Sequence, residues 1–341
     1  MNPIINTLLH DELARYDLML DQAIDEQEGY LTDLEKKMYK KGKRLRPIML
    51  LLSAKLSQRE DSPLDDKVIL SAVSLEMLHV ASLIHDDIID CAPTRRGYPS
   101  IKEARGSNMA VLIGDLQFLQ AMRGLLKSVV VQEDISIIEK ILKAGYEICI
   151  GEIDELRVDP AKAYDDLTEM ECSYMNIIDR KTAALFGISC EAGAALANSK
   201  SIHLAALSLF GRYFGQAYQI MDDINDFLKS SDNAGKQQHI DLVQKKLSLP
   251  IINALRELPP NNALYNYLTD KAIDDTALQE AVAAVVKSES FVSTYNKARE
   301  IMLNAIHQLS VFGDSPYKSA LESIAFEVIN GKKAEQTATT I

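Results

Sequence analysis

Proline placement constrains the fold of this chain more than any other feature. No proline lies between Pro99 and Pro160, or between Pro160 and Pro250. Because proline breaks the interior of an α-helix, these two stretches are free to be helical. Both are rich in Ala, Leu, Ile, Met, Glu and Lys at helical spacing. The middle of the chain is therefore predicted to form long helices.

The segment 67–90 is the clearest of these helices. Its apolar residues cover most of the helix circumference, which is typical of a helix inside a bundle. These residues are Leu70, Val73, Leu75, Met77, Leu78, Ala81, Leu83 and Ile84. Similar helices are predicted over 107–128, 134–157, 165–197 and 201–229. No run of strands is indicated.

Two segments have the composition of loops. One is 91–100, with two prolines and a glycine, and the other is the polar segment 230–238. The polar tail 331–341 is expected to fray. We find no linker, internal repeat or low-complexity tract, so we predict a single all-α domain over 1–341, built as one large helical bundle.

Charge and cysteine usage narrow the class of protein. The net charge is −12, whereas nucleic-acid binding needs a basic surface. An acidic chain can still bind diphosphates if divalent metal ions bridge the two anions. No two of the four cysteines have CxxC spacing, so they are expected to be free thiols in a reducing cytoplasm. They are Cys91, Cys149, Cys172 and Cys190.

The N-terminal segment carries acidic residues and lacks the basic start of a signal peptide. No run reaches the roughly 18 apolar residues expected of a membrane span. We therefore expect a soluble, cytoplasmic protein with at most peripheral membrane contact.

Two acidic clusters carry the strongest chemical signal. Residues 86–90 read DDIID and residues 222–226 read DDIND, so each has the pattern DDxxD. Residues four apart share a helix face, so Asp86 projects with Asp90 and Asp222 with Asp226. Each cluster follows a strongly apolar stretch, where carboxylates would repel one another and lose hydration. Such oxygen ligands suit Mg²⁺ bound jointly with substrate phosphates.

Exposed helix ends and a di-iron site would also contain grouped acidic residues. Exposed acidic helix ends are common, but two matching clusters after apolar helices are not typical of them. A di-iron bundle would need ExxH spacing, which GEIDEL at 151–156 lacks.

Basic residues alternate with these clusters along the acidic chain. Residues 41–46 read KGKRLR, and Arg95 and Arg96 follow the first cluster within six positions. Lys181 lies in mid-chain, and further lysines follow the second cluster: Lys236, Lys245 and Lys246. Arginine and lysine are natural diphosphate ligands.

Taken together, these motifs resemble the trans-isoprenyl diphosphate synthases. The matching segments, in family order and spacing, are GKRLRP, SLEMLHVASLIHDDIID, RRG, GD at 114–115, RKTAALF and QIMDDIND. The resemblance covers about residues 40–255. It implies the all-α isoprenoid synthase fold with a central cavity.

The resemblance also implies roles for individual residues. Asp86 and Asp90 would ligate two Mg²⁺ ions and Asp222 a third, with Asp87, Asp223 and Asp226 supporting them. Isopentenyl diphosphate would be held by Lys43, Arg46, His79 and Arg96. The allylic diphosphate would be held by Arg95, Lys181, Thr182, Gln219, Lys236 and Lys246. Taken alone, His79 reads as a core histidine, but it shares the face of Asp86.

In this family, bulky aromatic residues at positions 81 and 82 stop chain growth early. Both positions hold small residues here, Ala81 and Ser82. Counting back from Asp86 by helical spacing adds Leu78 and Leu75 as chain-length candidates. The chain thus resembles long-chain synthases, hexaprenyl and heptaprenyl in particular. We expect a product of about C30 to C40 from farnesyl diphosphate, used for quinone side chains such as those of menaquinone.

The segments GEIDEL and NIIDRKTAALF resemble the catalytic large subunit of two-component bacterial synthases. A small regulatory partner or an ordinary homodimer therefore both remain open. Two departures stand out. Leu116 replaces the usual tyrosine after GD, and the element around Lys246 lacks its glycine.

Three alternative functions remain. A short-chain farnesyl or geranylgeranyl synthase would fit the motifs, although Ala81 and Ser82 argue against it. A terpene cyclase or head-to-head synthase would not need the isopentenyl diphosphate residues. A non-catalytic subunit would be expected to have broken motifs, and all six aspartates are present.

Overall fold

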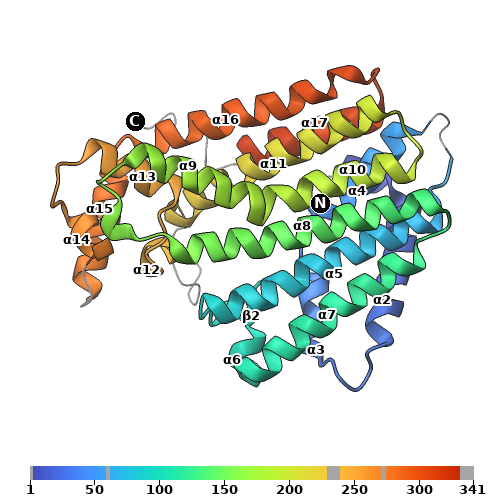
Figure 1. The fold of residues 1–341 in the computed structure, drawn as a ribbon, viewed down its shortest axis with the longest axis horizontal. Coiled ribbons are helices and arrows are strands. Elements are labelled where there is room, and N and C mark those ends of the chain that lie inside the picture. Colours follow the sequence, from blue (N-terminus) through green and yellow to red (C-terminus); the bar gives the residue numbers. More distant parts are fainter. Residues whose placement is uncertain (1–2, 59–61, 229–238, 270–273, 331–341) are drawn as a thin grey trace. The chain divides into compact units, whose positions relative to one another are not determined.

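The structure, a computed structural model, describes residues 3–58, 62–228, 239–269 and 274–330 (Figure 1). Within them the chain is almost entirely helical, which confirms the all-α prediction. The chain divides into two compact units. Unit 1 comprises Met1–Gly145, Leu185–Gly211 and Gln308–Glu322, and unit 2 comprises Tyr146–Ala184, Arg212–His307 and Ser323–Ile341. The predicted loop 230–238 and the predicted frayed tail lie outside the described residues.

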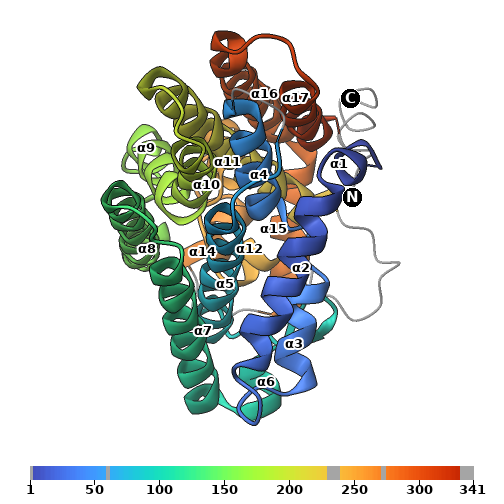
Figure 2. The same cartoon turned by 90° about the vertical axis from the view of Figure 1, so that its right-hand side faces the viewer.

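Unit 1 is built around α5 (Asp66–Ile89), which was predicted over 67–90. It packs against α2 (His10–Asp25), α4 (Leu45–Ser57) and α7 (Ser107–Lys127), and Figure 2 shows it between α2 and α7. The other elements of its N-terminal part are α1 (Pro3–Leu8), α3 (Asp33–Lys40), β1 (Thr94–Arg95), β2 (Tyr98–Pro99) and α6 (Ile101–Arg105).

The segment 91–100 was predicted as a loop and contains a minimal hairpin. The two-residue strands β1 and β2 pair antiparallel, with Arg95 opposite Tyr98. The turn uses Arg96 and Gly97 at φ 54° and 82°, where glycine is readily accommodated.

Two long helices continue from one unit into the other: α8 (Gln132–Arg157) and α11 (Ser201–Leu228). Both match the predicted segments 134–157 and 201–229 to within two residues. The rest of unit 1 comes from α10 (Ala184–Leu196), η3 (Leu309–Val311) and the start of α17 (Pro316–Ile329).

The segment that was predicted as one helix over 165–197 begins in unit 2 and ends in unit 1. Asp166 starts it, because its side chain accepts from the amides of Thr168 and Glu169. The segment then runs as α9 (Leu167–Ile178), a π-helical turn η2 (Asp179–Ala183) and α10. A π turn adds a residue without ending the helix, so apolar periodicity alone did not reveal it.

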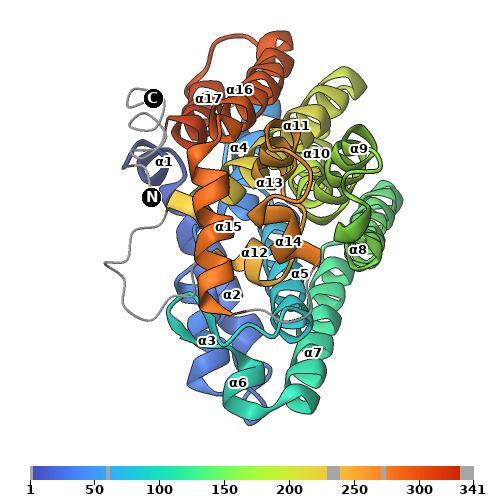
Figure 3. The ribbon, with the colours of Figure 1, turned by 90° about the vertical axis from the view of Figure 1, so that its left-hand side faces the viewer.

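Among the remaining helices of unit 2, α15 (Asp275–Lys287) contacts α12, α13 and α14 (Figure 3). The bounds are η1 (Pro160–Lys162), α12 (Ile240–Val243), α13 (Leu249–Glu257), α14 (Ala263–Thr269) and α16 (Ser290–Gln308).

By length and composition, two described helices, α5 and α7, could cross a membrane, with mean hydropathies of 1.7 and 1.2. The apolar window of α5 is 72% buried, as in the core helix of a soluble protein, whereas that of α7 is only 39% buried. All four cysteines are free, as predicted.

Candidate active site

The first aspartate cluster ends α5 in unit 1. The amide of Asp90 donates to the carbonyl of Asp86 at 2.8 Å, so the helical turn continues through the cluster. Asp86 and Asp90 are half-buried and lie one turn apart, the shared face that their spacing predicted.

Asp87 lies between them in sequence but is buried, with 1% of its surface exposed. Nε and Nη2 of Arg95 both donate to its Oδ1, at 2.8 and 2.5 Å. Burial raises the pKa of Asp87, and the Arg95 guanidinium opposes that rise. Asp87, the second aspartate of the motif, is thus bound by Arg95, an arginine that the sequence analysis had assigned to substrate binding.

The hairpin that carries Arg95 is docked on the N-terminal helices. A guanidinium nitrogen of Arg96 donates to the carbonyl of Met38. The Tyr98 ring lies under Lys37 and Lys41, whose ammonium groups are 5.3 and 4.1 Å from the ring centroid. Cation–π contacts of this kind add about 0.5–1 kcal/mol at exposed sites. They fix the hairpin, and with it the two arginines.

His79 lies about two helical turns before Asp86, and the charges of three arginines act on it. Burial lowers the pKa of His79 well below its usual value, and the charges of Arg46, Arg96 and Arg95 lower it further. A neutral imidazole can donate one N–H to an anion without adding charge. Arg46 also stacks over Phe186, 4.3 Å from the ring centroid, while Lys43 is exposed.

Glu76 was missed by the sequence reasoning. It is 1% exposed, and its Oε1 has no hydrogen-bond partner. Burial raises its pKa, and the charges of Arg96 and Arg46 oppose the rise. The sequence does contain a signal for this residue. Glu76 is a single acidic residue in an otherwise apolar stretch, three residues before His79.

The GD pair at 114–115 packs around the histidine that precedes the cluster. Nε2 of His85 lies 3.3 Å from the Val111 carbonyl and 3.5 Å from Oδ1 of Asp115. A Cβ on Gly114 would lie 2.2 Å from His85 Nε2. Only glycine leaves room for this ring.

The second aspartate cluster lies in the last two turns of α11, in unit 2. Asp222 is exposed, whereas Asp223 and Asp226 are 7% and 5% exposed. Asp226 Oδ2 accepts from the amide of Asp241 at 3.3 Å. The two ends of this cluster therefore differ in exposure, unlike those of the first.

Asp223 is held by neutral donors. Tyr174 Oη donates to its Oδ2 at 2.6 Å, and Gln219 Nε2 donates to its Oδ1 at 2.8 Å. Thr182 Oγ1 donates in turn to Gln219 Oε1 at 2.8 Å. Burial raises the pKa of Asp223 well above its usual value, and Asp241 adds to the rise. Tyr174 was missed, because nothing in its sequence surroundings marks it.

Asp241 was also missed. Burial, reinforced by the negative charge of Asp226, raises its pKa to about 7. Half-buried Asp241 forms an acidic group with buried Asp223 and Asp226, and this group gains from protons or cations.

The predicted diphosphate lysines of unit 2 are engaged by carboxylates. Lys181 Nζ lies 2.5 Å from Glu152 and 2.7 Å from Glu155. Lys246 Nζ lies 3.2 Å from the same oxygen of Glu155. Lys236 lies outside the described residues.

The chain-length candidates all lie on α5. Leu75, Leu78 and Ala81 are buried, and Ser82 is half-buried, with its hydroxyl donating to the His79 carbonyl at 2.8 Å.

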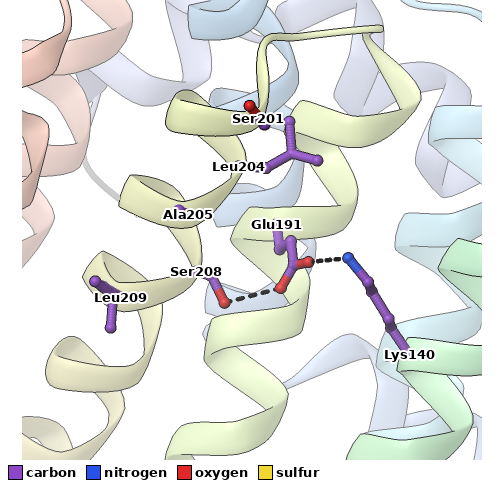
Figure 4. Close-up of a pocket in the computed structure, with 7 residues that line it drawn as sticks. All are labelled: Lys140, Glu191, Ser201, Leu204, Ala205, Ser208 and Leu209. Atoms are coloured by element: carbon purple, nitrogen blue, oxygen red, sulfur yellow. Dashed lines mark hydrogen bonds and ion pairs between the residues drawn. The ribbon is translucent and has the colours of Figure 1, made fainter.

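A shallow groove of unit 1 lies apart from these residues (Figure 4). There Glu191 accepts from Lys140 at 2.5 Å and from Ser208 at 2.8 Å. None of the predicted site residues lines it.

The accessible carboxylates of the clusters fit a hard divalent cation. Asp86 and Asp90 on successive turns, and exposed Asp222, offer the oxygen donors that Mg²⁺ takes together with phosphates. Among residues 3–58, 62–228, 239–269 and 274–330, no three acidic, histidine or cysteine side chains are grouped as a metal site by themselves.

The chain is similar to known proteins along most of its length. The family model for polyprenyl synthetase matches residues 28–285. The octaprenyl diphosphate synthase of Haemophilus influenzae is 31% identical over 84% of this chain and 83% of its own length. Heptaprenyl diphosphate synthase component 2 of Bacillus subtilis is 30% identical over 94% of this chain and 88% of its own length.

A solved structure has the same fold. It is a polyprenyl synthase from Caulobacter crescentus, complexed with calcium and isoprenyl diphosphate, with a TM-score of 0.85 and 25% identity. The match covers 96% of both chains. The two aspartate motifs, the family model and these relatives agree: this chain belongs to the polyprenyl synthetase family of prenyltransferases.

Proposed function

We propose that this chain is a Mg²⁺-dependent long-chain trans-polyprenyl diphosphate synthase. It would add isopentenyl diphosphate to an allylic diphosphate, farnesyl diphosphate being the expected primer, by 1′-4 condensation. The observation that carries the proposal is the end of α5, where half-buried Asp86 and Asp90 lie one turn apart and the charges of three arginines act on His79. Anion and metal ligands on one helix end are what a metal-bound diphosphate needs.

The chain's own residues would divide the work between two diphosphates. Arg46, Arg96, Lys43 and neutral His79 would bind isopentenyl diphosphate and orient its alkene. Lys181, Thr182, Gln219, Lys236 and Lys246, with Arg95, would bind the allylic diphosphate. The aspartates Asp86, Asp90, Asp222 and Asp226 would hold the metal ions, with Asp87 and Asp223 in support.

Mg²⁺ would supply the pull of electron density into the departing diphosphate. The allylic C–O bond breaks, the alkene attacks the resulting carbocation, and a proton is lost. Cations at fixed positions stabilise the charge that develops on the leaving group. The departing diphosphate is the proposed proton acceptor, because the sequence indicates no dedicated base.

We propose that α5 also sets product length. Small Ala81 and Ser82 leave space where an aromatic ring would block growth, which favours about C30 to C40 products over short-chain ones. Replacing Ala81 or Ser82 with Phe should shorten the products, whereas Ile89→Phe at an exposed position of the same helix should not. Unchanged product lengths in both inward variants would exclude this role.

The exposed face of α7 supports a subunit interface. Leu112, Leu119 and Leu126 recur every seven residues and are 62%, 59% and 66% exposed. An apolar seam of this period is typical of helix pairing. Two relatives are named component 2 of heptaprenyl diphosphate synthase. The subunit that packs on this face of α7 is therefore either a second copy of the chain or a small regulatory subunit. Leu112→Arg with Leu119→Arg should change the oligomeric state measured by light scattering, whereas Lys102→Glu on α6 should not.

A product-length assay tests the function. The purified protein is incubated with farnesyl diphosphate, labelled isopentenyl diphosphate and Mg²⁺, and the dephosphorylated products are sized. Long products from the protein alone would support a self-sufficient synthase. Activity that appears only with a small protein from the same genome would support the two-component form. Inactivity in both arms would overturn the proposal. A cytoplasmic location and use in quinone side chains are part of the same proposal.

A further inference from the structure

One carboxylate in unit 2 bridges two of the proposed diphosphate lysines. Oε2 of Glu155 lies 2.7 Å from Lys181 Nζ and 3.2 Å from Lys246 Nζ. Glu152 completes the group at 2.5 Å from Lys181. Two ammonium groups thus face two carboxylates, and the group as a whole is neutral.

The four side chains are largely shielded from water. Those of Glu152, Lys181, Glu155 and Lys246 are 11%, 19%, 22% and 24% exposed. Burial alone would raise the pKa of Glu155, but Lys181 and Lys246 outweigh it and lower the pKa. Burial would lower the pKa of Lys181, but Glu155 and Glu152 raise it. Glu155 and Lys181 are therefore both charged at neutral pH, and salt screens this pair less than a surface pair.

The backbone of α8 and η2 brings Lys181 close to the two glutamates. Lys181 lies in the π turn η2, and Gly151 of α8 lies directly against it. A Cβ on Gly151 would be 2.8 Å from Lys181 Cγ and 2.9 Å from Arg180 Cβ. The close approach that glycine permits brings Glu152 and Glu155 to the lysine. The pairing is set by the fold of unit 2 and not by mobile surface side chains.

We propose that Glu155 is a positioning residue that keeps Lys181 and Lys246 together when no diphosphate is bound and competes with diphosphate for both lysines. This inference rests on the proposed function, in which the two lysines bind diphosphate. A diphosphate that arrives must share ammonium groups already paired with a carboxylate. Glu155 therefore limits how tightly diphosphate is retained and favours its release after each addition.

The charge balance gives the sign of the effect. Glu155→Gln keeps the shape of the side chain and can still accept a hydrogen bond from lysine, but it changes the charge of the group from neutral to positive. An anion beside the lysines is then bound more tightly, by about tenfold given partial screening.

Binding of inorganic pyrophosphate, measured by calorimetry with Mg²⁺ on the full-length protein, tests this. Glu155→Gln should lower the dissociation constant about tenfold. It should also lower KM for the allylic primer and lower kcat, because pyrophosphate leaves more slowly. Glu155→Asp, which keeps the charge, should stay within about twofold of wild type. Asp154→Asn is the matched control, because Asp154 pairs with Arg180 and not with either lysine.

Pyrophosphate affinity in Glu155→Gln that is equal to or weaker than that of wild type would overturn the inference. So would an equal gain in Glu155→Asp. If Glu155→Gln does not fold, Glu152→Gln removes a charge from the same group and should also bind more tightly. No pyrophosphate binding by the wild-type protein would instead overturn the proposed function, so the two failures are distinguishable.

Discussion

The two aspartate clusters have the same DDxxD pattern but different surroundings. In unit 1 the middle aspartate, Asp87, is paired with the guanidinium of Arg95. In unit 2 its counterpart, Asp223, is held by the neutral donors Tyr174 and Gln219, with the acid Asp241 nearby. The second aspartate of one cluster is thus paired with a cation, and that of the other with neutral donors. One motif can therefore describe two different electrostatic sites.

Loss of the accessible first aspartate should have the largest effect at either cluster. Asp86→Ala and Asp222→Ala should each lower kcat by about 10³-fold, because each would remove a carboxylate proposed to hold the metal ions that stabilise the leaving diphosphate. Steady-state elongation assays measure this. Asp66→Ala, at the opposite end of α5 and paired with Arg15, is the control. Full activity in either cluster variant would remove that cluster from the site.

The two clusters should differ most clearly in stability when the side chain that binds the second aspartate of each is replaced. Arg95→Gln leaves buried Asp87 without its cation and should cost about 2–4 kcal/mol of unfolding free energy. Tyr174→Phe removes one neutral hydrogen bond and should cost about 1–2 kcal/mol. Urea unfolding of the metal-free protein measures both. Equal losses of unfolding free energy would mean that the charge of the second aspartate is balanced in the same way in both clusters.

The acidic surroundings of the second cluster should appear in the pH dependence of stability. The pKa of Asp241 is raised from 3.8 to about 7, so the folded state keeps a proton that the unfolded state loses. Stability is therefore lost as pH rises between these values and then levels off. Asp241→Asn should raise the unfolding free energy above pH 7 by about 1–3 kcal/mol and leave it unchanged below pH 4. A pH-independent difference would contradict this account.

The smallest expected effect is at the hairpin of β1 and β2, which follows the first aspartate cluster. Tyr98→Leu removes the ring between Lys37 and Lys41 and loosens the segment that carries Arg95 and Arg96. KM for isopentenyl diphosphate should rise about threefold with little change in kcat, because one exposed cation–π contact is weak. A change confined to kcat would argue against a binding role for the hairpin.

Sequence predicted the long helices well, because apolar periodicity and proline placement are local properties. It placed α5, α7, α8 and α11 to within about two residues at each end. It also predicted that Asp86 and Asp90 share a face. It missed the π turn at Asp179–Ala183, because one added residue hardly disturbs the pattern.

The partners of the site residues were harder to predict, because they come from distant parts of the chain. Tyr174 is 49 residues from Asp223, and Glu155 is 26 from Lys181. Neither spacing has a local signature. Glu76 is a buried acid and Asp241 a half-buried one, and the environment of each is set by packing, which composition does not reveal. The roles of the individual site residues remain predictions.

A double-mutant cycle within the first cluster tests most directly whether Asp86 and Asp90, which share a helix face, hold one metal-bound diphosphate. Mg²⁺-dependent pyrophosphate binding is measured by calorimetry for wild type, Asp86→Ala, Asp90→Ala and the double variant. If both carboxylates hold the same diphosphate through metal, the double variant should be little weaker than either single one, with a coupling of about 1–3 kcal/mol. Losses that simply add would show that the two aspartates act independently, and would contradict the account.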